Sequence, residues 1–236
     1  MSGARHSDAI EAGSQGAVAV PLHVRLGQPR LRGVSHAWAF WCALIAGTVL
    51  TLYAPSGMAR ASAIVYGAGL CALFAASGLY HRWPWNPRWR PLLRRIDHST
   101  IYVFIAASYT PVALLVLSGT IQIVVLASIW GGALAGVALS VAWITAPRVL
   151  VAASYVALGW VAIVSLPQMA DRLGVAPIVL FAAGGVIYSV GAVVYASRRP
   201  NPWPSTFGFH EIFHALVILA AVTHFVAIAG WVIPAG

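Results

Sequence analysis

The sequence predicts an all-α integral membrane protein, a bundle of seven transmembrane helices with the N-terminus in the cytoplasm and the C-terminus outside. Three observations predict this fold. First, 60% of the 236 residues are hydrophobic and only 8% are charged, whereas soluble domains carry roughly a quarter charged residues. Second, several apolar runs reach the ~20 residues that are needed to cross a hydrocarbon core. Third, the arginines gather in alternate loops, as basic residues do on the cytoplasmic side of a membrane.

The chain divides into a polar N-terminal region and an apolar remainder. We expect residues 1–28 to form a flexible cytoplasmic tail and residues 29–236 to form the seven-helix membrane domain. The tail contains Gly and Ser and lacks the apolar core of a secretory signal peptide. The first hydrophobic helix is therefore expected to remain in the mature protein.

Seven apolar runs, separated by Gly, Pro and polar residues, define the membrane spans. Because lipid offers no partner for exposed backbone groups, each span is expected to be a helix. The predicted spans are His36–Ala54, Ala61–His81, Ile96–Ser118, Ile121–Ile144, Val149–Met169, Ala176–Ser197 and Phe209–Ile233.

The distribution of arginine predicts the orientation. The formal net charge is +9, and the chain contains arginine but no lysine. With the N-terminus inside, 12 of the 14 arginines fall on the cytoplasmic side and only Arg60 and Arg172 fall outside. This bias is the usual signature of cytoplasmic loops. It explains the basic charge without nucleic acid, so we expect membrane lipids and no nucleic acid as partners.

Ionisable side chains within the spans are costly, so each one is a functional candidate. The second predicted helix ends on the side where the third and seventh begin, so His81, Asp97, His210 and His214 share one depth near the cytoplasmic face. His210 and His214 are four residues apart, which places two imidazoles on one face of a helix. With His81 they form a three-histidine set that leaves a fourth position open, as in catalytic zinc sites.

Two further polar residues complete the predicted site. Asp97 is placed to orient a water on the metal and accept its proton. Ser77, four residues before His81, is placed to donate to a substrate carbonyl. Both have simpler interpretations: Asp97 can cap a helix or pair with Arg94 or Arg95, and Ser77 can serve helix packing.

Three more histidines are expected to lie outside the metal site. His36 begins the first span and is interpreted as an interfacial residue. His98 is expected to point away from its neighbour Asp97. His224 lies ten residues, ~15 Å, beyond His214, which is too far for the same ion. A polar contact deep in the bundle is expected for it instead.

The seventh span also contains the string His210-Glu211-Ile212-Phe213-His214, or H-E-x-x-H. In zincins this string supplies two metal ligands and a general-base glutamate. An intramembrane protease of this kind would use Glu211 as the base and Asp97 as the third ligand, which leaves His81 unexplained. The third histidine at matching depth favours the three-histidine site.

Several short motifs together resemble the hemolysin III family, within the progestin and adiponectin receptor superfamily. They run from about residue 29 to the C-terminus and cover all seven spans. The motifs are Pro29-Arg30-Leu31-Arg32-Gly33-Val34-Ser35-His36, Ser77-Gly78-Leu79-Tyr80-His81, Arg95-Ile96-Asp97-His98-Ser99, Tyr109-Thr110-Pro111 and Phe209-His210-Glu211-Ile212-Phe213-His214.

The resemblance implies a seven-helix fold with a zinc ion near the cytoplasmic side. By matching motif, His81, His210 and His214 would be the zinc ligands, Asp97 would hold the zinc-bound water, and Ser77 would match the family's serine. The short chain looks like the bacterial type, which implies the prokaryotic plasma membrane. No oligomeric state is predicted.

The predicted function is metal-dependent hydrolysis of a lipid acyl bond, amide or ester, as in the ceramidase-like activity associated with the receptor branch. Two alternatives stay open. The first is a pore-forming or cytolytic membrane protein without turnover. The second is a ligand-sensing receptor in which zinc is structural.

Overall fold

The computed structural model describes residues 27–55 and 57–236. Seven helical segments of this part are long and apolar enough to cross a membrane. They confirm the predicted seven-helix bundle. The expected flexible tail, residues 1–28, lies outside the described residues except for Gly27 and Gln28.

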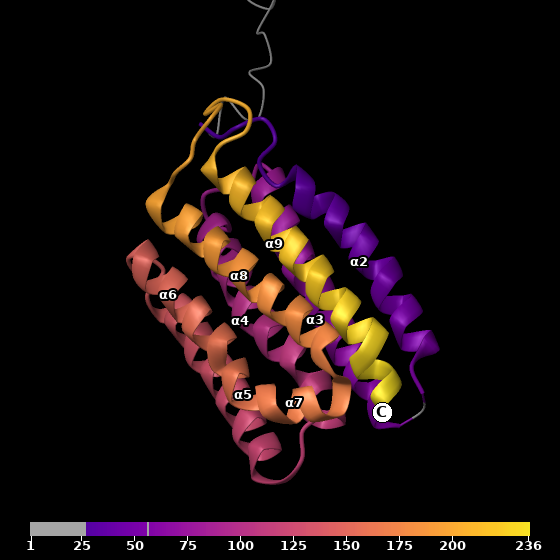
Figure 1. Cartoon of the computed structure of the whole chain (residues 1–236). Helices are drawn as coiled ribbons and strands as arrows, with labels where there is room; N and C mark the ends of the chain where they lie inside the picture. The colour runs from indigo at the N-terminus through magenta and orange to yellow at the C-terminus, as the bar shows by residue number, and fades with distance from the viewer. Residues whose placement is uncertain (1–26, 56) are drawn as a thin grey trace, which may run out of the picture.

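The spans follow one another along the chain as antiparallel neighbours (Figure 1). The fifth consists of three consecutive segments, and the seventh ends in a short π-helix and a 3-10 turn. Their bounds are α2 (Val34–Tyr53), α3 (Met58–Arg82), α4 (Arg90–Leu115), α5 (Gly119–Ala142), α6 (Arg148–Gly159) with η2 (Trp160–Ser165) and α7 (Leu166–Leu173), α8 (Val175–Ser197), and α9 (Phe209–Ala227) with η3 (Ile228–Val232) and η4 (Ile233–Ala235).

Helix α4 begins earlier than the apolar pattern predicts. It starts at Arg90 instead of Ile96, and Pro91 occupies its first turn, where a missing backbone amide costs nothing. The arginines of its first two turns depress the local hydropathy, but their charged ends can reach the interface while their methylene stems stay on the helix. Hydropathy alone therefore places the start of this helix too late.

The fifth span is not one continuous α-helix. It was predicted as Val149–Met169, but α6 ends at Gly159, a 3-10 segment follows, and α7 starts at Leu166 with Pro167 in its first turn. Proline has no amide to donate and its ring clashes with the carbonyl four residues earlier. Pro167 therefore interrupts the α-helical ladder over the segment before it.

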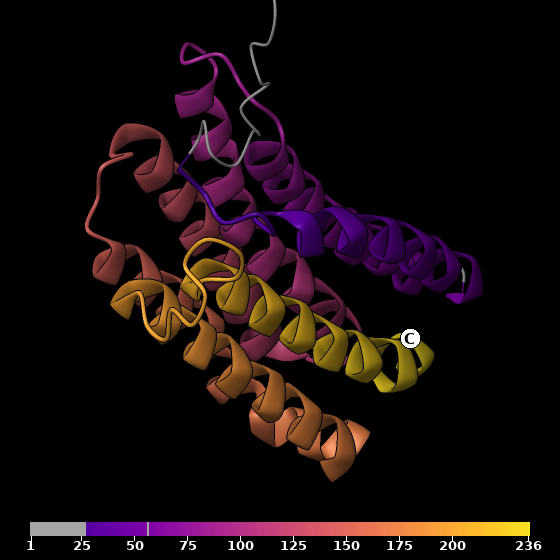
Figure 2. The same ribbon diagram turned by 90° about the horizontal axis from the view of Figure 1, so that it is seen from above.

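The helices form a closed arrangement around the bundle axis. Helix α3 lies between α2 and α4, α5 contacts α4, α8 packs on α6 and α9, and α9 returns to α2. Figure 2 shows α9 lying beside both α2 and α8. Helices α2 and α3 approach closely at two glycines: a Cβ on Gly47 would lie 3.2 Å from the Cα of Gly67. A second close approach, where a Cβ on Gly78 would lie 3.1 Å from the Cα of Ala37, brings the first turn of α2 against the last turns of α3.

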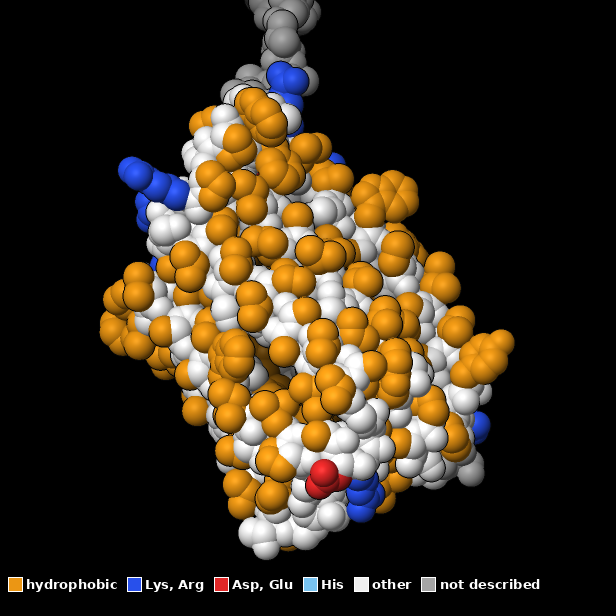
Figure 3. Space-filling view, viewed as in Figure 1, with side chains coloured by type: hydrophobic (Ala, Val, Ile, Leu, Met, Phe, Trp, Pro, Cys, Tyr) orange, Lys and Arg blue, Asp and Glu red, His pale blue; other side chains and the backbone are white. Residues whose placement is uncertain are grey.

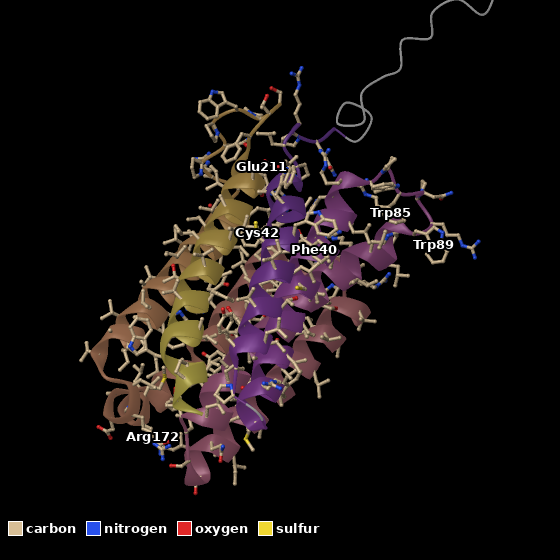
Figure 4. The ribbon with its side chains drawn as sticks, turned by 90° about the vertical axis from the view of Figure 1, so that its right-hand side faces the viewer. Phe40, Cys42, Trp85, Trp89, Arg172 and Glu211 are labelled. Carbon is tan, nitrogen blue, oxygen red and sulfur yellow. The ribbon has the colours of Figure 1, made fainter. Side chains whose placement is uncertain are left out.

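Most of the ionisable residues singled out in the sequence lie at one end of the bundle. We call it the histidine end; α3 ends there at Arg82, and α4 and α9 begin there at Arg90 and Phe209. Figure 4 shows Glu211, Trp85 and Trp89 at this end and Arg172 at the opposite end.

The outer surface of the bundle is apolar. Large hydrophobic side chains point outward along the spans, among them Leu52 at 72% exposure and Val175 at 71%. Figure 3 shows hydrophobic side chains spread over the whole face in view, with the few charged groups at its margins and near its lower end. Such a surface suits hydrocarbon and not water, as the composition predicts.

Candidate metal centre

Two helices, α3 and α9, bring the three predicted histidines together at the histidine end. His81 comes from the last turn of α3, and His210 and His214 come from the first turns of α9. One ring nitrogen from each residue lies within 4.8 Å of the other two. The Nε2 atoms of His81 and His210 are 3.2 Å apart. Sequence spacing anticipated this cluster, because the alternating direction of the helices places these residues at one depth.

The donor set fits a transition-metal ion. Two nitrogens bound tetrahedrally to zinc at ~2.0–2.1 Å lie roughly 3.3 Å apart, close to the 3.2 Å separation of the His81 and His210 nitrogens. The Nδ1 atom of His214 is buried and has no hydrogen-bond partner among the described residues. Unpaired buried polar atoms are costly, and three imidazoles without a thiolate suit zinc well. The residues present therefore fit the implied metal.

Asp97 lies beside this cluster. Its Oδ2 atom is 3.7 Å from His81 Nε2, and the residue is buried. Because α4 begins at Arg90, Asp97 stands two turns inside the helix and does not cap it. Within the described chain, Asp97 forms no ion pair with Arg94 or Arg95. The helix-cap interpretation of Asp97 is therefore wrong.

His36 belongs to the same cluster, and its interpretation as a merely interfacial residue is wrong. It is only 2% exposed. Its Nε2 donates to the carbonyl of His214 (3.3 Å), so its Nδ1 accepts from the Ser77 hydroxyl (2.7 Å). Its ring stacks on the His214 ring with centroids 3.8 Å apart. The depth argument that grouped the other histidines applies equally to the start of the first span.

The contacts of Glu211 do not favour a catalytic role. Its Oε1 pairs with Arg32 Nε at 2.5 Å, and its Oε2 accepts from the Gly208 amide at 2.7 Å as part of the N-terminal cap of α9. Both oxygens are thus engaged at the helix start. A general base must be free to take a proton from the reacting water. The geometry of Glu211 does not favour the H-E-x-x-H protease interpretation.

The segment before α2 covers the site at the histidine end. The amides of Arg30 and Leu31 donate to the carbonyls of Ser205 and Thr206 at 3.0 and 3.1 Å, which ties this segment to the loop before α9. Gly33 has a φ of 73°, and a Cβ there would overlap the His81 side chain. Only glycine permits both the left-handed conformation and this close approach.

The remaining histidines lie along the interior. His98, expected to point away from Asp97, lines the main cavity, and its carbonyl accepts from the Tyr155 hydroxyl at 3.2 Å. His224 Nε2 donates to the Phe181 carbonyl at 3.1 Å. That contact lies deep in the bundle, as the sequence predicts for His224.

A cavity of about 200 Å³ opens from the histidine cluster into the bundle. Its polar end is lined by His36, Ser77, Asp97, His210 and His214, and its remainder is largely apolar and bounded by α4, α6–η2–α7, α8 and α9. On α4 its lining extends from Asp97 to Val112, about 22 Å at 1.5 Å per residue. Figure 3 shows the surface hollowed between α8 and the α6–η2–α7 segment.

Seven apolar spans and a largely buried three-histidine cluster define a multi-pass integral membrane protein with a candidate metal centre. A model of the family described as "Haemolysin-III related" matches residues 24–225, and the chain belongs to this family.

Two bacterial relatives and one animal relative are similar over most of their length. Hemolysin-3 of Bacillus cereus is 31% identical over 72% of this chain and 74% of its own. The Hemolysin-3 homolog of Bacillus subtilis is 30% identical over 65% of this chain and 69% of its own. The human monocyte to macrophage differentiation factor is 28% identical over 82% of this chain and 80% of its own. The Bacillus relatives are consistent with a bacterial plasma membrane.

Proposed function

We propose that this protein is a zinc-dependent hydrolase that cleaves an acyl bond, amide or ester, of a membrane lipid. One observation carries the proposal: the three-histidine cluster stands at the polar end of an apolar cavity within the bundle. A ligand with a polar head and a hydrocarbon chain matches both parts of that space.

The position of each residue in the site determines the role that we propose for it. His81, His210 and His214 would hold the zinc ion, which when bound would polarise the acyl carbonyl and activate a water molecule. Asp97, beside His81, would accept the proton that the attacking water loses and return it to the leaving amine or alkoxide as the acyl bond breaks. The Ser77 hydroxyl can turn from His36 toward the acyl oxygen and donate to it. The apolar walls along α4 and α8 hold the acyl chain and exclude bulk water.

The orientation is part of the proposal: the histidine end faces the cytoplasm. Eight arginines of the loops and helix ends support this, since they lie in the second, fourth and sixth loops or the turns beside them, whereas Arg60 and Arg172 lie toward the other end. A C-terminal alkaline phosphatase fusion should be active and a C-terminal green fluorescent protein fusion dark. The reverse pattern would overturn the orientation.

The test of the function has two stages with purified, detergent-solubilised protein. Elemental analysis should find about one zinc per chain in the wild type and a loss of zinc in His81→Ala and in His210→Ala/His214→Ala. Release of a fluorescent fatty acid from a labelled ceramide should then depend on zinc and on Asp97. A wild type without metal would refute the mechanism. Full zinc with no turnover on amide or ester lipids would leave the receptor with structural zinc as the better account.

A further inference from the structure

A second, small pocket opens at the histidine end, between the start of α4, the end of α5 and the start of α6. We call it the arginine pocket. It is lined by Arg94, His98, Ser140, Trp143, Arg148 and Tyr195, with a few aliphatic neighbours. Arg94 and Arg148 are both half-buried, so two arginines that are not fully solvated line one pocket.

The arginine pocket adjoins the main cavity. His98 and Tyr195 line both spaces. The Arg148 Cζ atom lies 5.7 Å from the centre of the Tyr195 ring, and that ring lies 5.9 Å from the His210 ring. Tyr195 thus contacts the arginine pocket on one side and the candidate metal centre on the other.

Helix geometry sets the spacing between the two sites. Arg94 precedes Asp97 by three residues and His98 by four, so all three lie on neighbouring positions of one face of α4. Side chains so related are about 5–6 Å apart at their Cβ atoms. Arg94 is therefore attached to α4 about one helical turn from Asp97, the carboxylate that borders the histidine cluster.

Within the described part of the chain neither arginine forms an ion pair; the ion pairs there are Arg32–Glu211 and His81–Asp97. The neighbouring Arg95 differs from these two arginines, because its side chain donates a hydrogen bond to the Val141 carbonyl. The preference of arginine for cytoplasmic loops explains why basic residues occur at this end. It does not explain why two of them converge on one pocket that opens beside the cavity.

We propose that the arginine pocket binds the phosphate of an anionic acyl lipid whose hydrocarbon chain enters the main cavity. Guanidinium groups bind phosphate oxygens through paired, charge-assisted hydrogen bonds. The aromatic rings of Tyr195 and Phe209 hold the Arg148 guanidinium in place from 5.7 and 5.9 Å. The one-turn spacing matches a lipid in which the acyl bond and the phosphate are joined by a short glycerol or sphingoid backbone.

This inference rests on the proposed function only where it names the bond that is cleaved; binding of the phosphate can be measured without turnover. The ligand pair is dioctanoyl phosphatidic acid and dioctanoylglycerol, which share their acyl chains and differ in the phosphate. Binding to the purified zinc-loaded full chain is followed by isothermal titration calorimetry. Glycerol 3-phosphate, which carries the phosphate without chains, is the third ligand.

The wild type should bind dioctanoyl phosphatidic acid at least about tenfold more tightly than dioctanoylglycerol, a modest value for two charge-assisted contacts. Arg94→Gln/Arg148→Gln should lose this preference and keep its zinc. Arg88→Gln/Arg90→Gln removes the same charge at the same end of the bundle and should keep the preference.

Equal affinity of the wild type for the two lipids would overturn the proposal without any variant. Loss of the preference in both double variants would also overturn it, since a general basic surface would then be responsible. Glycerol 3-phosphate that binds as tightly as phosphatidic acid would overturn the lipid assignment. Phosphate-dependent lipid binding without hydrolysis would sink the proposed function alone, and hydrolysis of ceramide without a phosphate preference would sink this inference alone.

Discussion

Replacing His36 with phenylalanine separates its hydrogen bonds from its packing. Phenylalanine is close in size and can keep the stack on His214, whose ring centroid lies 3.8 Å from that of His36. The change removes the bonds to the Ser77 hydroxyl and the His214 carbonyl. Ser77 is 3% exposed, and a buried hydroxyl that loses its partner costs about 1–3 kcal/mol.

The same change should weaken metal binding. The His36 contact with the His214 carbonyl and the His36 stack both orient a candidate ligand, and partners that orient metal ligands are worth about 10–100-fold in affinity. We expect the zinc Kd of His36→Phe to rise about tenfold or more. A competing chelator measures this Kd in detergent. The visible bands of the cobalt-substituted protein should shift as well, because the His214 ring is held less rigidly.

His224→Phe is the matched control. The His224 Nε2 atom also donates to a backbone carbonyl, that of Phe181, but the ring lies far from the cluster. The control should lower the melting temperature and leave zinc affinity and the cobalt spectrum unchanged. If His36→Phe binds zinc as tightly as the wild type, or if both variants weaken zinc equally, then His36 does not support the metal centre.

Three further changes test other parts of the site. Glu211→Gln should reduce the free energy of unfolding by about 1–3 kcal/mol and keep both zinc and hydrolysis; loss of turnover in a folded, zinc-loaded variant would revive Glu211 as a general base. Gly33→Ala should lower zinc content, because a Cβ there overlaps His81 and a positive φ costs ~1–2 kcal/mol; Gly27→Ala, at φ 57° in open space, is the control and should retain zinc. Gly185→Leu places a side chain in the main cavity and should slow hydrolysis of long-chain lipids more than short-chain lipids, as rates across a series of chain lengths would reveal.

Hydropathy predicts the spans well because the hydrocarbon core imposes the same demand on every helix. It fails where local chemistry competes with that demand. The start of α4 is missed because its arginines look like loop residues, and the break before Pro167 is missed because the surrounding residues remain apolar. Both errors concern the backbone within or beside a span. Neither changes the number of spans.

The histidine cluster could be predicted because three of its members stand at helix ends whose depth follows from topology. His36 stands at a comparable position, but a lone histidine at the start of a span has the same pattern whether it faces lipid headgroups or the interior. The pairing of Arg32 with Glu211 joins residues 179 positions apart, and no local pattern reports it. The sequence predicts the depth of a residue in the membrane and the helical face on which it lies. Which residue it contacts across the bundle is known only from the packed structure.

The contacts between α2 and α9 have a consequence for biosynthesis. Arg32 and His36 are made early in translation, whereas Glu211 and His214 are made near its end. Because membrane helices enter the bilayer as the ribosome delivers them, the first span must wait in the membrane until the seventh arrives. Binding of a metal ion by the histidine cluster would then require a fully inserted chain. A chain that stalls before its last helix would leave Arg32 without Glu211 and His36 without His214, and both residues would be exposed to quality-control proteases.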